Sequence, residues 1–153
     1  MGYIEDIRKL VGHRPLILVG AVVVMVDEHG RILLQQRKFP KGSWGLPGGL
    51  MELGESTEDV ARREVFEETR LTVEDLRLIN VYSGPGQYSK AENGDEFFAV
   101  TVAYYTENYS GTIVVDQAEL NDCQFIDPLE LPEGIVKSHR KVVMDYLALT
   151  KKQ

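Results

Sequence analysis

Three glutamates near the middle of the chain have a spacing that could bind a metal ion. Glu64, Glu67 and Glu68 stand at i, i+3 and i+4, which places their side chains on one face of a helix. Like charges at these spacings repel by roughly 0.2–0.5 kcal/mol per pair, so helix propensity gives no reason to group them. Carboxylates without nearby histidine or cysteine suit magnesium or manganese better than zinc. For three glutamates alone, the alternative is a solvated acidic face neutralised by arginines of the same segment.

The residues around these glutamates resemble the Nudix box. Gly49 is followed after five residues by Glu55 and, after seven more, by the segment 63–68, with Leu71 two residues beyond it. The family signature places a glycine, a glutamate, an arginine and three further glutamates at these intervals. The segments 34–37 and 44–49, Leu-Gln-Gln-Arg and Trp-Gly-Leu-Pro-Gly-Gly, are also similar to the family's approach to its box. The resemblance implies a Nudix hydrolase whose box occupies residues 49–71.

This resemblance also implies roles for the acids. Glu64, Glu67 and Glu68, with the backbone carbonyl of Gly48, are expected to bind one or more Mg²⁺ ions, with Mn²⁺ as the alternative. The metal would neutralise charge on a substrate diphosphate and activate a water molecule. Glu67 or Glu68 could take the proton from that water.

In some relatives the general base lies on a late loop outside the box. Here Glu119 and Asp122 are the acids available for that role, with Glu119 the weak candidate we retain.

Arg63 and Glu55 complete the expected catalytic set. Arg63 is expected to orient the glutamates through a charge-assisted hydrogen bond, with Glu55 as its partner. One position departs from the family, because Arg70 stands where the box has glycine. Glycine there would end the helix with a positive φ, and arginine in that conformation costs on the order of 1 kcal/mol. Since every acid and Arg63 remain, we expect an active enzyme with a strained helix end.

The resemblance indicates the bond that is broken but not the substrate. We expect hydrolysis of a phosphoanhydride in a nucleoside diphosphate linked to another group, as in ADP-ribose or a nucleotide sugar. The alternatives are a nucleoside triphosphate pyrophosphohydrolase and, in another class, a Nudix module that binds a nucleotide without cleaving it. Pro85 stands where ADP-ribose hydrolases carry a proline, and Tyr88 where dinucleoside-polyphosphate hydrolases carry a tyrosine. The substrate contacts we expect are Arg37, Tyr88, Glu96 and Glu119.

Composition restricts the partners. The chain has 153 residues, 43% of them hydrophobic, and a net charge of −7, which argues against a nucleic-acid polymer as the main partner. The longest apolar stretch, 15–26, is too short to span a membrane, and the single cysteine, Cys123, cannot form an internal disulfide. We therefore expect a cytoplasmic protein that acts on a small molecule. Cys123 is expected to be buried and inert, and His13, His29 and His139 share no ligand-like spacing.

The elements that must position these residues indicate a mixed α+β fold, with a mixed β-sheet sandwiched between α-helices. We expect one domain over 1–153, with a helical extension at 1–13 that covers the core or a second subunit; a homodimer is left open. A hairpin of 16–26 with 31–37, a glycine-rich loop at 42–49 and a helix at 57–69, started by Ser56 and Asp59, should follow. The later elements are strands at 76–83, 97–106, 112–115 and 123–126, and a helix at 135–149.

Overall fold

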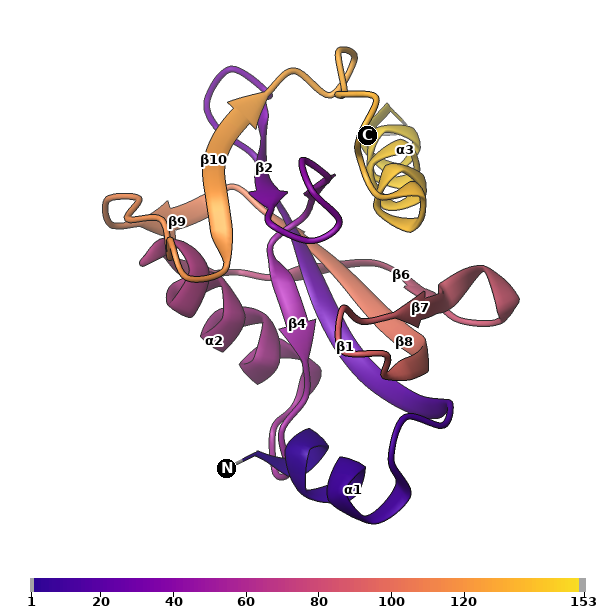
Figure 1. Cartoon of the computed structure of the whole chain (residues 1–153). Coiled ribbons are helices and arrows are strands. Elements are labelled where there is room, and N and C mark those ends of the chain that lie inside the picture. The colour runs from indigo at the N-terminus through magenta and orange to yellow at the C-terminus, as the bar shows by residue number, and fades with distance from the viewer. Residues whose placement is uncertain (1, 152–153) are drawn as a thin grey trace.

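The computed structural model describes residues 2–151 and has three α-helices arranged around a mixed sheet (Figure 1). The helices are α1 Tyr3–Val11, α2 Thr57–Thr69 and α3 Lys137–Lys151. The strands and one short 3-10 helix are β1 Leu16–Met25, β2 Ile32–Arg37, β3 Trp44–Gly45, β4 Gly48–Leu50, β5 Thr72–Glu74, β6 Arg77–Tyr82, η1 Pro85–Gln87, β7 Tyr88–Lys90, β8 Glu96–Thr106, β9 Asn108–Ser110 and β10 Leu120–Ile126.

The central sheet has the strand order β4-β1-β8-β6, with β7 also paired to β8. β1 and β8 run parallel from Leu16 opposite Phe97 to Met25 opposite Thr106, and the other pairs are antiparallel. A second sheet has the order β10-β2-β3, and β5 pairs with β9. The predicted mixed α+β class is therefore confirmed.

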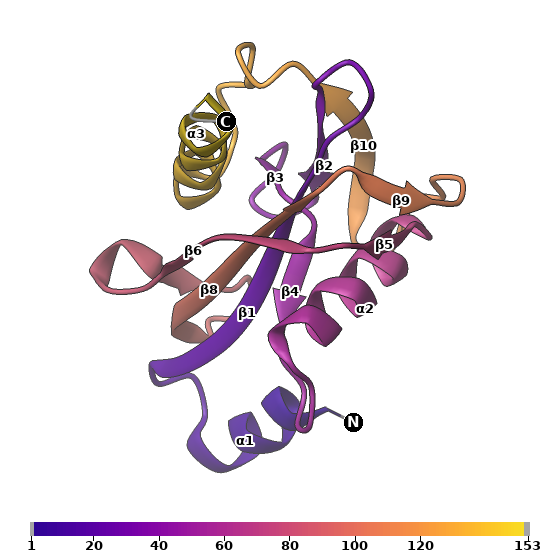
Figure 2. The same cartoon turned by 180° about the vertical axis from the view of Figure 1, so that it is seen from behind.

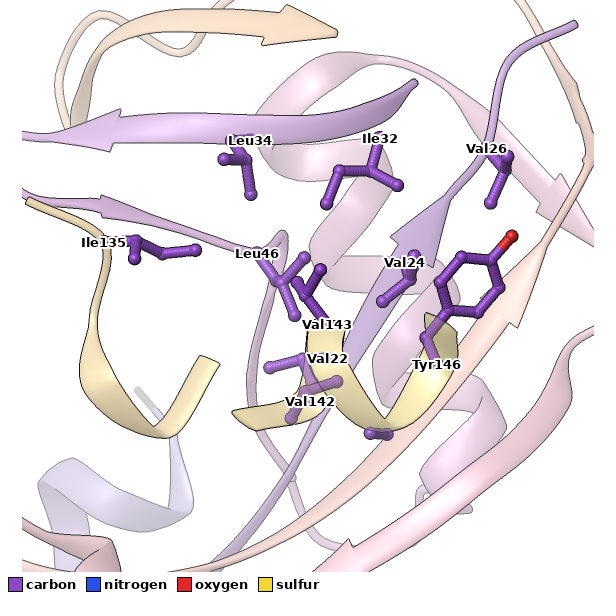
Figure 3. Close-up of a cluster of buried hydrophobic side chains, with 11 residues drawn as sticks. Val22, Val24, Val26, Ile32, Leu34, Leu46, Ile135, Val142, Val143 and Tyr146 are labelled. Atoms are coloured by element: carbon purple, nitrogen blue, oxygen red, sulfur yellow. The ribbon is translucent and has the colours of Figure 1, made fainter. Parts of the chain in front are cut away.

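From Gly20 to Met25, β1 is buried on both faces, which explains the continuous apolar sequence of this part. Alternate side chains of a strand point to opposite faces. One set, which includes Val22 and Val24, packs with Val142 and Val143 of α3 in the cluster of Figure 3. The other set packs with α2 in a second cluster. Figures 1 and 2 show α2 and α3 on opposite sides of β1 and β8, so the expected sandwich is present.

Three local predictions were wrong. The segments 16–26 and 31–37 do not form a hairpin, because β1 and β2 diverge into different sheets and meet only at a bridge between Val26 and Ile32. The segment 112–115 is not a strand, since the neighbouring strand is β9, which ends at Ser110. Part of the glycine-rich loop is strand, because β3 pairs with β2 and β4 pairs with β1.

The N-terminal helix is present, but none of its residues is buried. Leu10 is 83% exposed, whereas Ile4, Ile7 and Val11 of the predicted apolar face are half-buried, so α1 covers the rest of the chain only in part. Polar contacts also hold α1, with the Tyr3 N–H donating to Glu52 and the Arg8 guanidinium donating to the Glu96 carbonyl at 2.6 Å.

Within residues 2–151, no helix has the length and apolar character needed to cross a bilayer.

Candidate active site

The helix that carries the glutamates begins with a capping box. Ser56 accepts a hydrogen bond from the backbone N–H of Asp59 at 3.0 Å, and Asp59 accepts one from the backbone N–H of Ser56 at 3.0 Å. These bonds satisfy two backbone groups that a helix start leaves unpaired. The predicted start is confirmed, and Val60, Ala61 and Val65 then bury one face of α2 against the sheet.

Glycines allow β4 to lie tightly between β1 and α2. A Cβ on Gly48 would collide with the backbone of Ala21, and one on Gly49 would collide with the Glu64 carboxylate. The Gly48 N–H donates to Glu68 Oε1 at 3.0 Å. The first glycine of the box is therefore the residue that lets Glu64 approach the strand.

Arg63 contacts three carboxylates. Its Nε and Nη2 donate to the two oxygens of Glu55 at 2.7 and 2.9 Å, and Nη1 donates to Glu64 at 2.8 Å and more distantly to Glu67 at 3.4 Å. Nη2 also donates to the carbonyl of Leu50 at 3.0 Å. These bonds hold the pKa of Arg63 above its usual range and that of Glu55 below its usual range, with the hydrogen bonds between the two as the main cause. The expected contact between Arg63 and Glu55 is confirmed, and its role in catalysis stays a prediction.

The three box glutamates share a face but differ in exposure. Glu68 is 8% exposed, Glu64 is half-buried, and the Glu67 side chain is 54% exposed. Burial is the main cause that raises the pKa of Glu68 to about 8 and raises that of Glu64. The charge of Glu64 adds to the rise for Glu68, the charge of Glu67 adds to the rise for Glu64, and the charge of Glu119 adds to both. Glu68 has hydrogen-bond donors in Gly48 and Gln35 but no cationic hydrogen-bond or ion-pair partner within the described chain.

The donor set suits a divalent cation. Hard carboxylate oxygens gathered in a half-buried site are the ligands that Mg²⁺ or Mn²⁺ prefers, and a cation would offset the cost of the buried charge. Arg63 donates to oxygens of Glu64 and Glu67, and no group of three or more His, Cys, Asp or Glu side chains among residues 2–151 is arranged to hold an ion. The chemistry of the residues fits a metal, although the side chains do not converge on one point.

The loop after β9 lies beside the end of α2. The N–H groups of Val114 and Asp116 donate to the carbonyls of Thr69 and Glu68. Glu119, exposed on this loop, is near enough to raise the pKa of both Glu64 and Glu68. Asp122 instead accepts from its own strand, from Gln124 and the Cys123 N–H. Of the two late acids, the structure places Glu119 beside the carboxylates.

Arg70 ends α2 in the left-handed conformation that glycine normally supplies. Its φ is 66° and its N–H donates to the Phe66 carbonyl at 2.8 Å. Its guanidinium lies 5.2 Å from the centre of the Phe66 ring, a cation–π contact that offsets part of the backbone cost.

A cavity of about 200 Å³ opens beside β4. Its wall includes Gly48, Gly49 and side chains from distant elements, among them Arg37 at the end of β2 and Tyr88 in β7. The Arg37 guanidinium is half-buried and has no hydrogen-bond or ion-pair partner among the described residues. Burial lowers its pKa, and the nearby charge of Glu68 opposes that effect. A half-buried cation without a partner, on the wall of a cavity, suits an anionic group of a ligand.

Two other expected substrate contacts lie outside this wall. Glu96 accepts a hydrogen bond from the Tyr88 hydroxyl, and Tyr88 also packs edge-on against Phe98 with ring centres 5.4 Å apart. Glu96 therefore holds Tyr88 rather than lining the cavity, and Glu119 belongs with the carboxylates.

Sequence reasoning missed His139, which lines the cavity. Its exclusion rested on the absence of ligand-like spacing, a test that detects metal sites but not residues brought together by folding. Trp44 packs against the core cluster. Cys123 is half-buried rather than buried, and burial raises the pKa of its thiol to about 11, which agrees with an unreactive cysteine.

Comparison with known proteins agrees with this geometry. The family model described as the NUDIX domain matches residues 16–146, which include the carboxylate face, its glycine strand and the cavity. The chain belongs to the Nudix family. The helix and loop that hold its glutamates are therefore the Nudix box of this enzyme, and hydrolases of this family generally need divalent metal ions.

Several Nudix relatives are similar over most of their length. An ADP-ribose pyrophosphatase of Methanocaldococcus jannaschii is 29% identical over 83% of this chain and 72% of its own. A putative 8-oxo-dGTP diphosphatase of Bacillus subtilis is 30% identical over 83% of this chain and 78% of its own. The crystal structure of a MutT Nudix hydrolase from Burkholderia pseudomallei has a TM-score of 0.72 and 28% identity, and covers 85% of this chain and 98% of that one. The relatives share the family but carry different substrate names.

Proposed function

We propose that this Nudix hydrolase cleaves a phosphoanhydride bond in a nucleoside diphosphate linked to another group, with Mg²⁺ as its metal and Mn²⁺ as a substitute. The observation that carries the proposal is the buried carboxylate of Glu68. It has no cationic hydrogen-bond or ion-pair partner within residues 2–151, yet it lies next to Glu64 and to a strand that lines a cavity. A buried, unpaired acid is costly unless a cation binds it.

The residues of the box would have different roles in the reaction. Glu64, Glu67 and Glu68, with the carbonyl of Gly48, would hold the metal, which when bound neutralises phosphoryl charge and makes water acidic enough to attack. Glu67 is the most exposed of the three, and its carboxylate would take the proton from the attacking water. Arg63 keeps Glu64 in place while its other nitrogens hold Glu55.

The side chains on the cavity wall suit a substrate that has both a charged part and an aromatic part. The unpaired Arg37 guanidinium suits a phosphate oxygen, and the Tyr88 ring offers a surface for a base or a sugar. Tyr88 is held by Glu96 and Phe98, so its ring is already positioned. The name of the archaeal relative, ADP-ribose pyrophosphatase, agrees with such a substrate.

Removal of pyrophosphate from a nucleoside triphosphate is the second candidate. The bacterial relative named a putative 8-oxo-dGTP diphosphatase covers as much of this chain as the archaeal one does. Both reactions would use the same carboxylates and differ in the group that enters the cavity.

A product screen tests the proposal. Purified protein with Mg²⁺ would be incubated with ADP-ribose, nucleotide sugars, dinucleoside polyphosphates and nucleoside triphosphates, and the nucleotide products would be separated by chromatography. We expect release of a nucleoside monophosphate from a diphosphate-linked substrate, abolished by EDTA and by Glu68→Gln.

The matched control is Glu92→Gln, which removes an exposed glutamate outside the site. It should leave turnover unchanged. Faster turnover of triphosphates would favour the second candidate. Binding of nucleotide without hydrolysis of any phosphoanhydride would contradict both and indicate a binding module.

A further inference from the structure

His139 in the first turn of α3 makes one hydrogen bond that determines where its proton sits. Its Nδ1 accepts the backbone N–H of Leu46 at 2.9 Å. A neutral imidazole that accepts through Nδ1 carries its proton on Nε2 and donates from that atom. The Leu46 N–H therefore selects one tautomer of the ring.

The surroundings of the ring keep it neutral. Burial, together with the nearby Arg37 charge, lowers the pKa of His139 to about 3. Gly45 leaves room on this side, because a Cβ there would lie 3.0 Å from Nδ1 of His139 and 2.9 Å from a guanidinium nitrogen of Arg37. At neutral pH the ring is an uncharged donor next to a permanent cation.

The Nε2–H has no protein acceptor among the described residues, although His139 lines the cavity. His139 is half-buried and lines the cavity, so its Nε2–H can donate to water there or to an acceptor of a ligand that displaces the water. Uncharged polar side chains on the wall differ from His139: Gln87 accepts from Thr101, and Ser138 carries a hydroxyl that can also accept. The Nε2–H group is a donor only, next to a cation that suits the anionic part of a ligand.

We propose that His139 is a specificity residue whose Nε2–H donates to an uncharged acceptor, on the base or the sugar, of the nucleotide that the cavity takes. The proposal rests on the proposed function, because it assumes that the cavity receives the substrate. Arg37 then contacts phosphate, and His139 recognises the neutral part of the same molecule.

A simpler role would be to hold the loop through Leu46, and two variants separate these roles. In His139→Asn, the amide oxygen can replace Nδ1 as the acceptor for Leu46, but no donor reaches the position of Nε2. In His139→Gln, the longer amide can return a donor near Nε2, but the acceptor for Leu46 is lost.

Binding of AMP, GMP, CMP, UMP and ribose 5-phosphate to the metal-free wild-type protein would be measured by calorimetry. We expect one nucleotide to bind best, and His139→Asn to raise its Kd about tenfold with little change in Tm. His139→Gln should bind within about threefold of the wild type and have a lower Tm. Loss of ribose 5-phosphate binding in His139→Asn would assign the acceptor to the sugar, and an effect on the nucleotide alone would assign it to the base.

Nitrogen-15 NMR of labelled histidine gives a readout that needs no activity. We expect the spectrum of the wild type at neutral pH to show a proton on Nε2 alone, and the Nε2–H signal to move when the nucleotide is added. The NMR would overturn the proposal if it showed a proton on Nδ1 or a charged ring. The binding measurements would overturn it if the affinity of His139→Asn were unchanged, if both variants lost affinity equally, or if the wild type bound no nucleotide. If the wild type hydrolyses phosphoanhydrides but His139→Asn keeps the KM and Kd of the wild type, only the role of His139 fails.

Discussion

Arg63 leaves the three glutamates of the box with unequal freedom. Two of its nitrogens hold Glu55 and a third holds Glu64, whereas its contact with Glu67 is long at 3.4 Å. Glu68 is buried and accepts a hydrogen bond from the Gly48 N–H. Glu67 is therefore the acid with the most freedom to move a proton, and Glu119 is the nearest alternative from a loop.

Replacing each of these two acids by its amide distinguishes between them. We expect Glu67→Gln to lower kcat by about 10²–10⁴-fold, the usual contribution of a general base, and Glu119→Gln to lower it much less. Steady-state kinetics with saturating Mg²⁺ would measure both, with Glu92→Gln as the exposed control. If Glu119→Gln has the larger effect, the base lies on the loop after β9.

The helix end offers a test of stability that is independent of activity. Arg70 has a φ of 66°, which costs a residue with a side chain about 1–2 kcal/mol, while its contact with Phe66 returns about 0.5–1 kcal/mol. We expect Arg70→Gly to raise the free energy of unfolding by about 0.5–1 kcal/mol in urea, with turnover nearly unchanged.

Arg70→Ala is the control for that substitution. It keeps the positive φ and loses the ring contact, so it should be less stable than the wild type. A large loss of turnover in Arg70→Gly would show that the arginine has a catalytic role.

At the scale of elements, α1 is connected at its two ends to opposite sides of the active site. Its first residue, Tyr3, donates to Glu52, whose own N–H donates to Glu55. Near its last turn, Arg8 donates to the carbonyl of Glu96, the residue whose side chain holds Tyr88. A helix that buries no residue thus contacts both the carboxylate side and the cavity side.

Removing the Arg8 guanidinium should release α1. Besides Glu96, it donates to the carbonyls of Gly12 and Arg14 at 3.0 and 2.6 Å, and its side chain is 9% exposed. Since hydrogen bonds from charged groups contribute roughly 1.5–3 kcal/mol each and are not additive, we expect Arg8→Met to lose about 2–3 kcal/mol.

Hydrogen exchange would show faster exchange over 3–14 in that variant, and urea unfolding would give the loss of stability. Arg14→Met makes the same charge change at an exposed side chain and should stay within about 0.5 kcal/mol of the wild type. Unchanged protection of α1 in Arg8→Met would contradict this anchoring.

The sequence predicts the parts of this molecule that depend on near neighbours. The carboxylate face, the capping box and the contact between Arg63 and Glu55 lie within one helix and the turn before it. The hairpin prediction was wrong because β1 takes its long partner β8 from far along the chain. The segment 112–115 looked like a strand, but Val114 is 59% exposed and its N–H caps α2 by donating to Thr69.

The cavity could not be predicted in the same way. Arg37, Tyr88 and His139 come from β2, β7 and α3, and only the packing of the central sheet brings them onto one wall. Two of the three were proposed from the resemblance or from their chemistry. No local pattern marks His139, because its importance depends on a backbone N–H almost a hundred residues away.

For the whole molecule, which has a net charge of −7, a bound cation would reduce the repulsion among acidic residues. A ligand that binds only the folded state at about 100 times its Kd adds about 2.7 kcal/mol. We expect Mg²⁺ to raise the Tm of the wild type and EDTA to reverse the rise, as measured by calorimetry at constant ionic strength.

Glu68→Gln should abolish that rise, whereas Glu92→Gln should keep it. Because burial raises the pKa of Glu68, its ionised form lowers stability as pH rises through about 8, so the metal-free variant should be at least as stable as the wild type there. An equal Mg²⁺ response in the wild type and Glu68→Gln would place the bound cation elsewhere.

The parallel pairing of β1 with β8 also determines when the central sheet can form during synthesis of the chain. β1 is complete at Met25, but its ladder with β8 starts at Phe97 and ends at Thr106. Closing so long a loop before the contacts form slows folding, and until then β1 remains an apolar strand without its partner. On the ribosome, β1 must therefore remain unpaired with β8 until most of the chain has emerged, and during that interval its apolar residues favour aggregation.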